Sequence, residues 1–148
     1  MKNLDLLAAQ GAQDIITKTT GQEAGQVDNL ITKALGVLQE NGVYAALLYL
    51  YSRTSEADRA ISEKVREKLL SLTTELGLSK PASARARDAL KFLTDNICND
   101  LDRLLLVKQL WEQALIYARY GAKARGVADE AEKAKKDKEE AEKEKSQP

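Results

Sequence analysis

The stretch LDRLLLVKQLWEQALIYARYGAKAR, Leu101–Arg125, decides the fold of this 148-residue chain. It contains no proline, and its single glycine, Gly121, lies close to its end. Apolar residues recur at three- and four-residue intervals and form two adjoining helical faces. One face carries Leu101, Leu104, Leu105, Trp111, Leu115, Ala118 and Ala122, and the other carries Leu106, Leu110, Ala114 and Tyr117. An apolar arc this wide predicts a central helix packed by several others.

The other periodic segments upstream also predict helices. The run VYAALLYLY at residues 43–51 has the composition of a buried strand, but no second strand is available to pair with it, so it is assigned as helix. Asn41-Gly42 predicts a helix end, because glycine accepts the left-handed conformation that follows many helices. The expected fold is all-α: a compact bundle of about six helices with a long C-terminal core helix and a charged tail.

Three residues are predicted to mark helix starts. Ser55 is a typical N-cap, followed by acidic residues that favour a first turn. Pro81 suits the first turn of the next helix, because its missing N–H is not needed there. Asn99 is predicted to cap the last helix.

The chain changes composition at Ala128, where ADEAEKAKKDKEEAEKEKSQP begins. This segment has no large apolar residue, so it cannot dock on a core. Opposite charges recur four residues apart, and each such pair stabilises a helix by only ~0.2–0.5 kcal/mol. We therefore expect a helical bundle domain at residues 1–127 and a Glu/Lys-rich tail at 128–148 that is a fraying helix or disordered.

Net charge points to no partner, because the chain holds 23 basic and 23 acidic residues. Residues 129–148 account for eight acids and six lysines, which leaves fifteen acids and seventeen bases in residues 1–128. An excess this small does not indicate nucleic-acid binding by itself, so any such function requires a local basic patch.

Histidine is absent and cysteine occurs once, at Cys98. These absences exclude zinc sites built from clustered Cys and His, and catalytic triads built on an imidazole base. Cys98 lies in the apolar segment NICND and is predicted to be a small buried hydrophobe rather than a nucleophile.

Carboxylates are the remaining route to metal chemistry, as in all-α nucleotide pyrophosphatases that hold Mg²⁺ between paired helices. The best candidates are Glu63 with Glu67, but neighbouring lysines and arginines are typical of a salt-linked surface. We expect no cofactor, no metal and no small-molecule substrate. No apolar run approaches the ~20 residues of a membrane span, and the N-terminus lacks a signal-peptide pattern, so a cytoplasmic location without membrane partners is expected.

The basic residues are better candidates for a functional surface than the carboxylates. One group falls within twelve positions around a helix start, a second lies late in the long helix, and one arginine follows the aromatic run at 43–51. These candidates for contact with RNA phosphates are Lys80, Arg85, Arg87 and Lys91, then Arg119, Lys123 and Arg125, and finally Arg53. Such side chains neutralise phosphates without reading bases. Solvated surface charge is the competing interpretation of each of them.

Two blocks of sequence carry a resemblance to a known family. They are NGVYAALLYLYSR at Asn41–Arg53 and the segment from LLLVKQL to YARYGAKA within the long helix. Together they resemble the small all-helical subunit of type III-B CRISPR effector complexes, the Cmr family, and in particular its archaeal members. Members often carry a further aromatic-rich C-terminal segment, whereas this chain continues into its Glu/Lys tail.

The resemblance implies a non-catalytic subunit of an RNA-guided antiviral complex. Copies of such a subunit stack into a filament beside the backbone subunits that hold the guide RNA, and they contact the target RNA. The expected partners are therefore backbone subunits, copies of the chain itself, and the ribonucleoprotein of guide and target RNA. Two alternatives remain open: a small subunit of another CRISPR effector type, and a helical protein–protein adaptor without nucleic-acid binding. A metal-dependent nucleotide hydrolase is the enzymatic alternative.

Overall fold

The computed structural model describes residues 3–146, and all of its regular structure in that range is helical. Six helices follow one another along the chain: α1 (Leu4–Lys18), α2 (Ala24–Asn41), α3 (Val43–Tyr51), α4 (Glu56–Glu75), α5 (Ala86–Asn96) and α6 (Leu101–Lys145). The predicted all-α bundle with a long C-terminal helix is thus confirmed, and residues 43–51 are helix and not strand.

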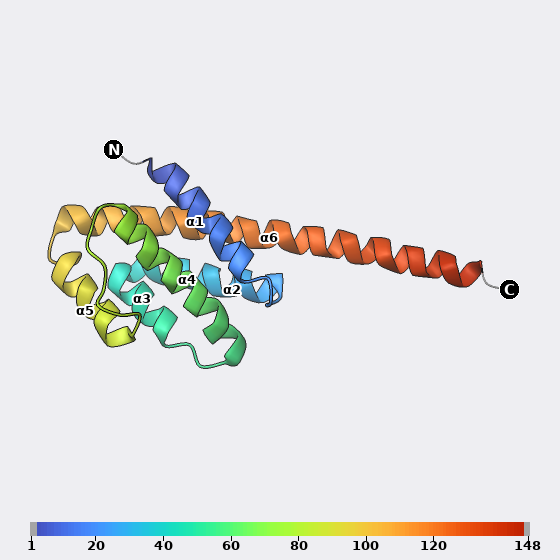
Figure 1. Ribbon diagram of the computed structural model, residues 1–148, viewed down its shortest axis with the longest axis horizontal. Coiled ribbons are helices and arrows are strands. Elements are labelled where there is room, and N and C mark those ends of the chain that lie inside the picture. The colour runs from blue at the N-terminus through green and yellow to red at the C-terminus, as the bar shows by residue number, and fades with distance from the viewer. Residues whose placement is uncertain (1–2, 147–148) are drawn as a thin grey trace.

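Helix α6 is the axis of the bundle. It packs against α1, α2, α3 and α4, which confirms the prediction of a central helix surrounded by others. Figure 1 shows α6 running along the whole length of the molecule, with α5 beside its first turns. Its 45 residues span about 67 Å at about 1.5 Å per residue.

The core between these helices is mostly apolar, and a buried polar contact within it joins α6 to α4. Trp111 of α6 is fully buried, and its indole Nε1–H donates to the Leu69 carbonyl at 3.0 Å and to Thr73 Oγ1 at 2.9 Å. Both acceptors belong to α4, so the largest core side chain also satisfies its only polar group. This contact holds α4 in a definite position on α6.

Two of the predicted helix starts were wrong, and one was right. The Ser55 hydroxyl accepts from the Asp58 N–H, as predicted. The cap of α6 is Asp100 and not Asn99, because the Asp100 carboxylate accepts from the Arg103 N–H while the Asn99 amide donates back to the Asp95 carbonyl. A carboxylate also interacts more favourably with the positive end of the helix dipole.

Helix α5 begins at Ala86, and Pro81 is not in its first turn. The backbone between Pro81 and Arg85 is satisfied by other bonds. Ser83 Oγ accepts from the Arg85 N–H at 3.1 Å, and the Tyr51 hydroxyl donates to the Ala84 carbonyl at 2.7 Å. These contacts stabilise an irregular connection across residues 76–85 in place of an earlier helix start.

Three leucines predicted to face the core are exposed instead. Leu101, Leu105 and Leu106 are 69%, 55% and 38% exposed, because no helix covers the first two turns of α6 on those sides. Cys98 is only partly buried, where full burial was predicted. Burial still raises the pKa of the Cys98 thiol, which disfavours the reactive thiolate.

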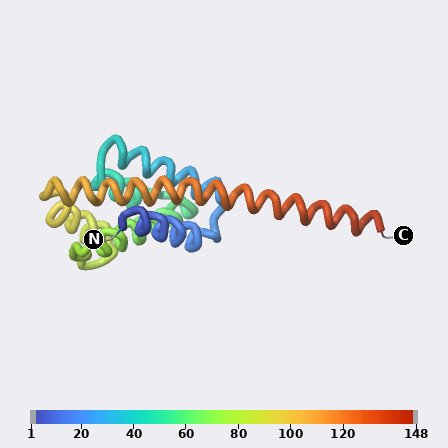
Figure 2. Tube along the Cα trace, turned by 90° about the horizontal axis from the view of Figure 1, so that it is seen from above, coloured from blue at the N-terminus to red at the C-terminus, as the bar shows by residue number. Residues whose placement is uncertain are grey.

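The tail segment continues α6 without a break as far as Lys145, and the side chains from Val127 to Ser146 are exposed. Figure 2 shows this part of α6 extending away from the other five helices. Within the described residues, no helix is both long enough and apolar enough to cross a membrane.

Gly42 is expected to tolerate substitution poorly because of its backbone conformation. It joins α2 directly to α3 at φ 95° and ψ −173°, a region that side chains other than glycine rarely adopt. Gly42→Ala should lower the free energy of unfolding by about 1–3 kcal/mol. Gly36→Ala is the matched control, since Gly36 lies within α2 and its missing Cβ faces open space. That change should stabilise by about 0.5–1 kcal/mol. Urea unfolding of both variants measures these changes, which should have opposite signs. Equal urea midpoints would contradict backbone strain in Gly42→Ala.

Candidate nucleic-acid interface

Tyr51, the last residue of α3, connects three basic segments of the chain. Its hydroxyl donates to the Ala84 carbonyl, immediately before Arg85. Its ring lies under the Arg66 guanidinium of α4, whose central carbon is 4.4 Å from the ring centre. Burial raises the pKa of Tyr51, and the positive charge of Arg66 opposes part of that rise. The phenol therefore stays protonated and keeps Arg66 and the segment before α5 together.

Arg53 is positioned by the end of α3. Its guanidinium lies 3.9 Å from the Tyr49 ring centre, and its Nε–H donates to the Tyr49 carbonyl at 3.2 Å. These contacts combine a cation–π interaction with capping of a helix C-terminus. They leave the charged group only partly exposed.

A hollow of approximately 350 Å³ lies between the end of α3 and the start of α4. Its charged lining combines three arginines with two glutamates: Arg53, Arg59, Arg66, Glu56 and Glu63. Leu50, Tyr51 and Ala60 complete the wall. The hollow therefore combines hydrogen-bond donors that suit phosphate with carboxylates that limit its positive charge.

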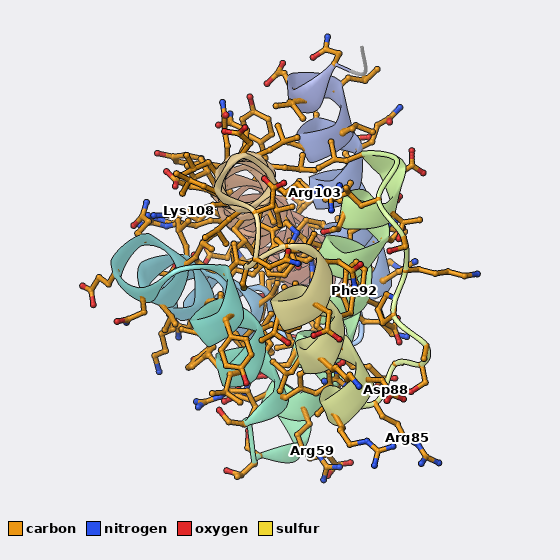
Figure 3. All side chains as sticks on the ribbon, turned by 90° about the vertical axis from the view of Figure 1, so that its left-hand side faces the viewer. Arg59, Arg85, Asp88, Phe92, Arg103 and Lys108 are labelled. Carbon is orange, nitrogen blue, oxygen red and sulfur yellow. The ribbon has the colours of Figure 1, made fainter. Side chains whose placement is uncertain are left out.

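The cations around α5 are the most accessible of the predicted candidates. Lys80, Arg85, Arg87 and Lys91 are all exposed, and the Arg87 side chain reaches 91% exposure. Asp88 is the nearby acid; it accepts from the Ser83 hydroxyl at 2.5 Å and lies 3.8 Å from Arg87. Figure 3 shows Arg85 projecting from the molecule below Asp88, with Arg59 on the same lower edge in that view. We call Lys80, Arg85, Arg87 and Lys91 the α5 cations.

The second group of predicted cations, on α6, does not form one patch. It consists of Arg119, Lys123 and Arg125. Arg125 is only 17% exposed, and its guanidinium donates to the carbonyls of Thr19 and Gln22 in the connection between α1 and α2. Arg119 lies 3.9 Å from Asp28 of α2 and is half-buried. Lys123 alone of the three is exposed. Two of these cations are therefore engaged in holding helices together.

The structure thus brings Arg53 close to the connection that carries Arg85, whereas Arg125 lies at the connection between α1 and α2 and Arg119 lies beside Asp28 of α2. Figure 1 shows that the connection between α1 and α2 lies at the end of the bundle away from α5. Arg59 and Arg66 line the same hollow as Arg53 and were missed as candidates. Their seven-residue spacing places them on one side of α4, which the sequence does show. The contact between Arg66 and Tyr51 depends on tertiary packing and leaves no local signal.

This arrangement suits contact with a polyanion more than bond-making chemistry. Arginines and lysines at the α5 end supply charge-assisted donors to phosphate oxygens. Within residues 3–146, no group of three or more Cys, Asp or Glu side chains is placed to hold a metal ion.

Comparison with known proteins gives a fold likeness and no sequence match. No protein-family model matches the chain, and no curated protein matches it in sequence. A crystal structure of a CRISPR-associated Cmr5 family protein from Thermus thermophilus superimposes with a TM-score of 0.59 at 18% sequence identity. The superposition covers 84% of this chain and 97% of that protein. The chain therefore shares the fold of a Cmr5 family protein.

Proposed function

We propose that this protein is the non-catalytic small subunit of a CRISPR type III-B (Cmr) effector complex. In this role it stacks with copies of itself and contacts the backbone of the target RNA. The fold likeness to a Cmr5 family protein is the single observation that carries the proposal. The two sequence blocks at Asn41–Arg53 and within α6 resemble the same family, and they support the proposal independently of the superposition.

The α5 cations are the proposed centre of RNA contact. They are exposed, and Asp88 is the only acid paired with any of them in the described part of the chain. Arg53 and the hollow beside it extend this surface. Lys123 contributes from α6, whereas Arg119 and Arg125 are engaged with Asp28 and with the connection between α1 and α2. Contact of this kind gives affinity that depends on salt and not on base sequence.

Affinity purification of the tagged protein from its own host tests the proposal directly. The expected result is co-purification of CRISPR backbone subunits together with guide RNA, identified by mass spectrometry and RNA sequencing. If subunits of another CRISPR effector type were recovered, the protein would be assigned to that type instead. Recovery of protein partners without any RNA would favour the helical adaptor instead.

Neutralising two α5 cations should weaken RNA binding by the assembled complex. Arg87→Ala combined with Lys91→Ala removes two phosphate contacts, so the slope of log affinity against log salt should become shallower by about two. Fluorescence anisotropy with a labelled target RNA, between roughly 50 and 200 mM salt, measures that slope.

The matched control for this double variant is Lys18→Ala with Lys33→Ala, which removes the same charge from exposed positions on α1 and α2. The control should keep the wild-type slope. An unchanged slope in the α5 variant would remove these residues from the interface.

A further inference from the structure

The hollow between the end of α3 and the start of α4 has the size of a small-molecule site. Its volume of about 350 Å³ lies near the lower limit of the ~300–1,000 Å³ that such sites occupy. Figure 1 shows the connection between α3 and α4 at the edge of the bundle that lies farthest from α6 in that view. A volume near this limit suits a ligand of about one nucleotide and is too small for several.

Two of the three guanidiniums that line the hollow are held in place by tyrosines. Arg53 lies over the Tyr49 ring, and within the described residues it uses two of its five N–H donors, on the Tyr49 carbonyl and the Ser52 hydroxyl. Arg66 lies over the Tyr51 ring. Because these contacts already restrict both side chains, less conformational entropy is lost when they bind a ligand.

The arginines of the hollow are not neutralised by ion pairs. Among residues 3–146, no salt bridge joins Arg53, Arg59 or Arg66 to a carboxylate. Arg59 is exposed, and the other two are half-buried. A guanidinium donates two parallel hydrogen bonds to a phosphate group, so an oxyanion is the ligand that these side chains fit.

The two glutamates of the lining narrow the choice of anion. Three arginines with Glu56 and Glu63 give the hollow a formal charge of +1. Carboxylates repel a bare phosphate ion, but they accept hydrogen bonds from hydroxyl and amino groups. A ribonucleotide offers both kinds of group, because its phosphate accepts while its sugar hydroxyls and base amino groups donate. The lining therefore suits a nucleotide better than inorganic phosphate.

We propose that the hollow binds a ribonucleotide by its terminal phosphate, with the arginines on the phosphate and the glutamates on the sugar or base. A terminal phosphate carries a charge of about −1.5 to −2 at neutral pH, whereas a phosphate within a strand carries a single charge. Three guanidiniums therefore favour the terminal group. A free nucleotide and the end of an RNA strand share this chemistry. The proposal deepens the proposed function and rests on it only for RNA as the second source.

Isothermal titration calorimetry of the full-length protein tests the proposal with the four ribonucleoside 5′-monophosphates and with inorganic phosphate. At least one monophosphate should bind at least about tenfold more tightly than inorganic phosphate, because its sugar and base add hydrogen bonds to the carboxylates. If no monophosphate bound, or if all bound no more tightly than inorganic phosphate, the proposal would be overturned.

Arg59→Ala should weaken binding of the tightest monophosphate at least about tenfold, since a charged donor is lost. Arg59→Lys should fall between this variant and the wild type, because lysine keeps the charge without the planar fork. Lys64→Ala is the matched control: it removes the same charge from the same helix, but Lys64 does not line the hollow. Equal affinities of Arg59→Ala and Lys64→Ala would show that the nucleotide does not bind in the hollow. Far-UV circular dichroism verifies that all variants keep their helices.

Glu56→Ala combined with Glu63→Ala separates a nucleotide site from a general anion site. Loss of two negative charges should strengthen binding of inorganic phosphate. The ratio of nucleotide affinity to phosphate affinity should fall at least about fivefold, because the sugar and base lose their acceptors. An unchanged ratio would mean that the carboxylates do not contact the nucleotide, which would contradict their assigned role.

A short RNA with a terminal phosphate, compared with the same RNA without it, distinguishes the two sources. If the phosphate strengthens binding to the wild type but not to Arg59→Ala, the hollow takes the end of a strand. If it makes no difference while a free monophosphate binds, the hollow takes a free nucleotide.

Failure of this proposal differs from failure of the proposed function. If no nucleotide binds while CRISPR subunits and guide RNA still co-purify, only the assignment of the hollow is wrong. If a nucleotide binds through Arg59 in a protein that co-purifies with no RNA, the hollow is a nucleotide site and the RNA-binding role is wrong.

Discussion

Replacing Trp111 with alanine is expected to lower the free energy of unfolding by about 3–5 kcal/mol, the largest effect of any single substitution considered for this chain. The side chain is fully buried at the contact between α6 and α4, so its removal leaves a cavity that the rigid helices cannot close. For a chain of this size the melting temperature should fall by roughly 10–15 °C.

Two further variants separate the contributions of volume and polarity at this site. Trp111→Phe keeps most of the volume but removes the donor to Leu69 and Thr73, so it should cost less than alanine. Tyr120→Ala is the control, because Tyr120 is aromatic, lies on the same helix and is 64% exposed. Thermal unfolding followed by circular dichroism compares all three. A Trp111→Ala protein as stable as the control would show that α4 is not held by this contact.

Arg125→Ala is expected to cost about 2–3 kcal/mol of stability, because two carbonyls lose a charged hydrogen-bond donor. The guanidinium binds the Thr19 and Gln22 carbonyls, and Thr19 is buried, so water cannot replace both bonds freely. Urea unfolding measures the loss.

Lys123→Ala is the matched control for Arg125→Ala, since Lys123 lies two residues away and is exposed. It should leave the urea midpoint unchanged. Arg125→Lys should fall between the two, because lysine keeps the charge but lacks the planar fork that reaches two carbonyls. If Arg125→Ala and Lys123→Ala had equal urea midpoints, Arg125 would not stabilise the fold and would again be a candidate surface cation.

Helical periodicity was sufficient for most of the fold. The apolar stripes located six helices, and positive φ at Gly42 agrees with the helix end predicted at Asn41-Gly42. The wrong helix starts, Pro81 and Asn99, are places where more than one residue nearby could cap a helix. Asp100 caps α6 by accepting from the Arg103 N–H, whereas no side chain caps α5, which begins after Ser83 has accepted from the Arg85 N–H.

The candidate site was less predictable. The sequence does not indicate which basic side chains form contacts within the fold and which remain exposed to bind a partner. Arg119, Lys123 and Arg125 are close in sequence, yet packing directs the first toward Asp28 and the last toward the connection between α1 and α2. The two nearest elements, α2 and the end of α1, come from residues about a hundred positions away. Arg66 similarly contacts the Tyr51 ring, whose hydroxyl binds the Ala84 carbonyl, only because tertiary packing brings α3, α4 and the connection before α5 together.

The sequence by itself determined the helical class and the central position of α6. These properties depend on the 3.6-residue period, which any helix imposes locally. Only the tertiary structure decided that Leu101, Leu105 and Leu106 remain uncovered and that the α5 cations remain exposed. Exposure depends on which other helices pack nearby, and that is a property of the whole chain.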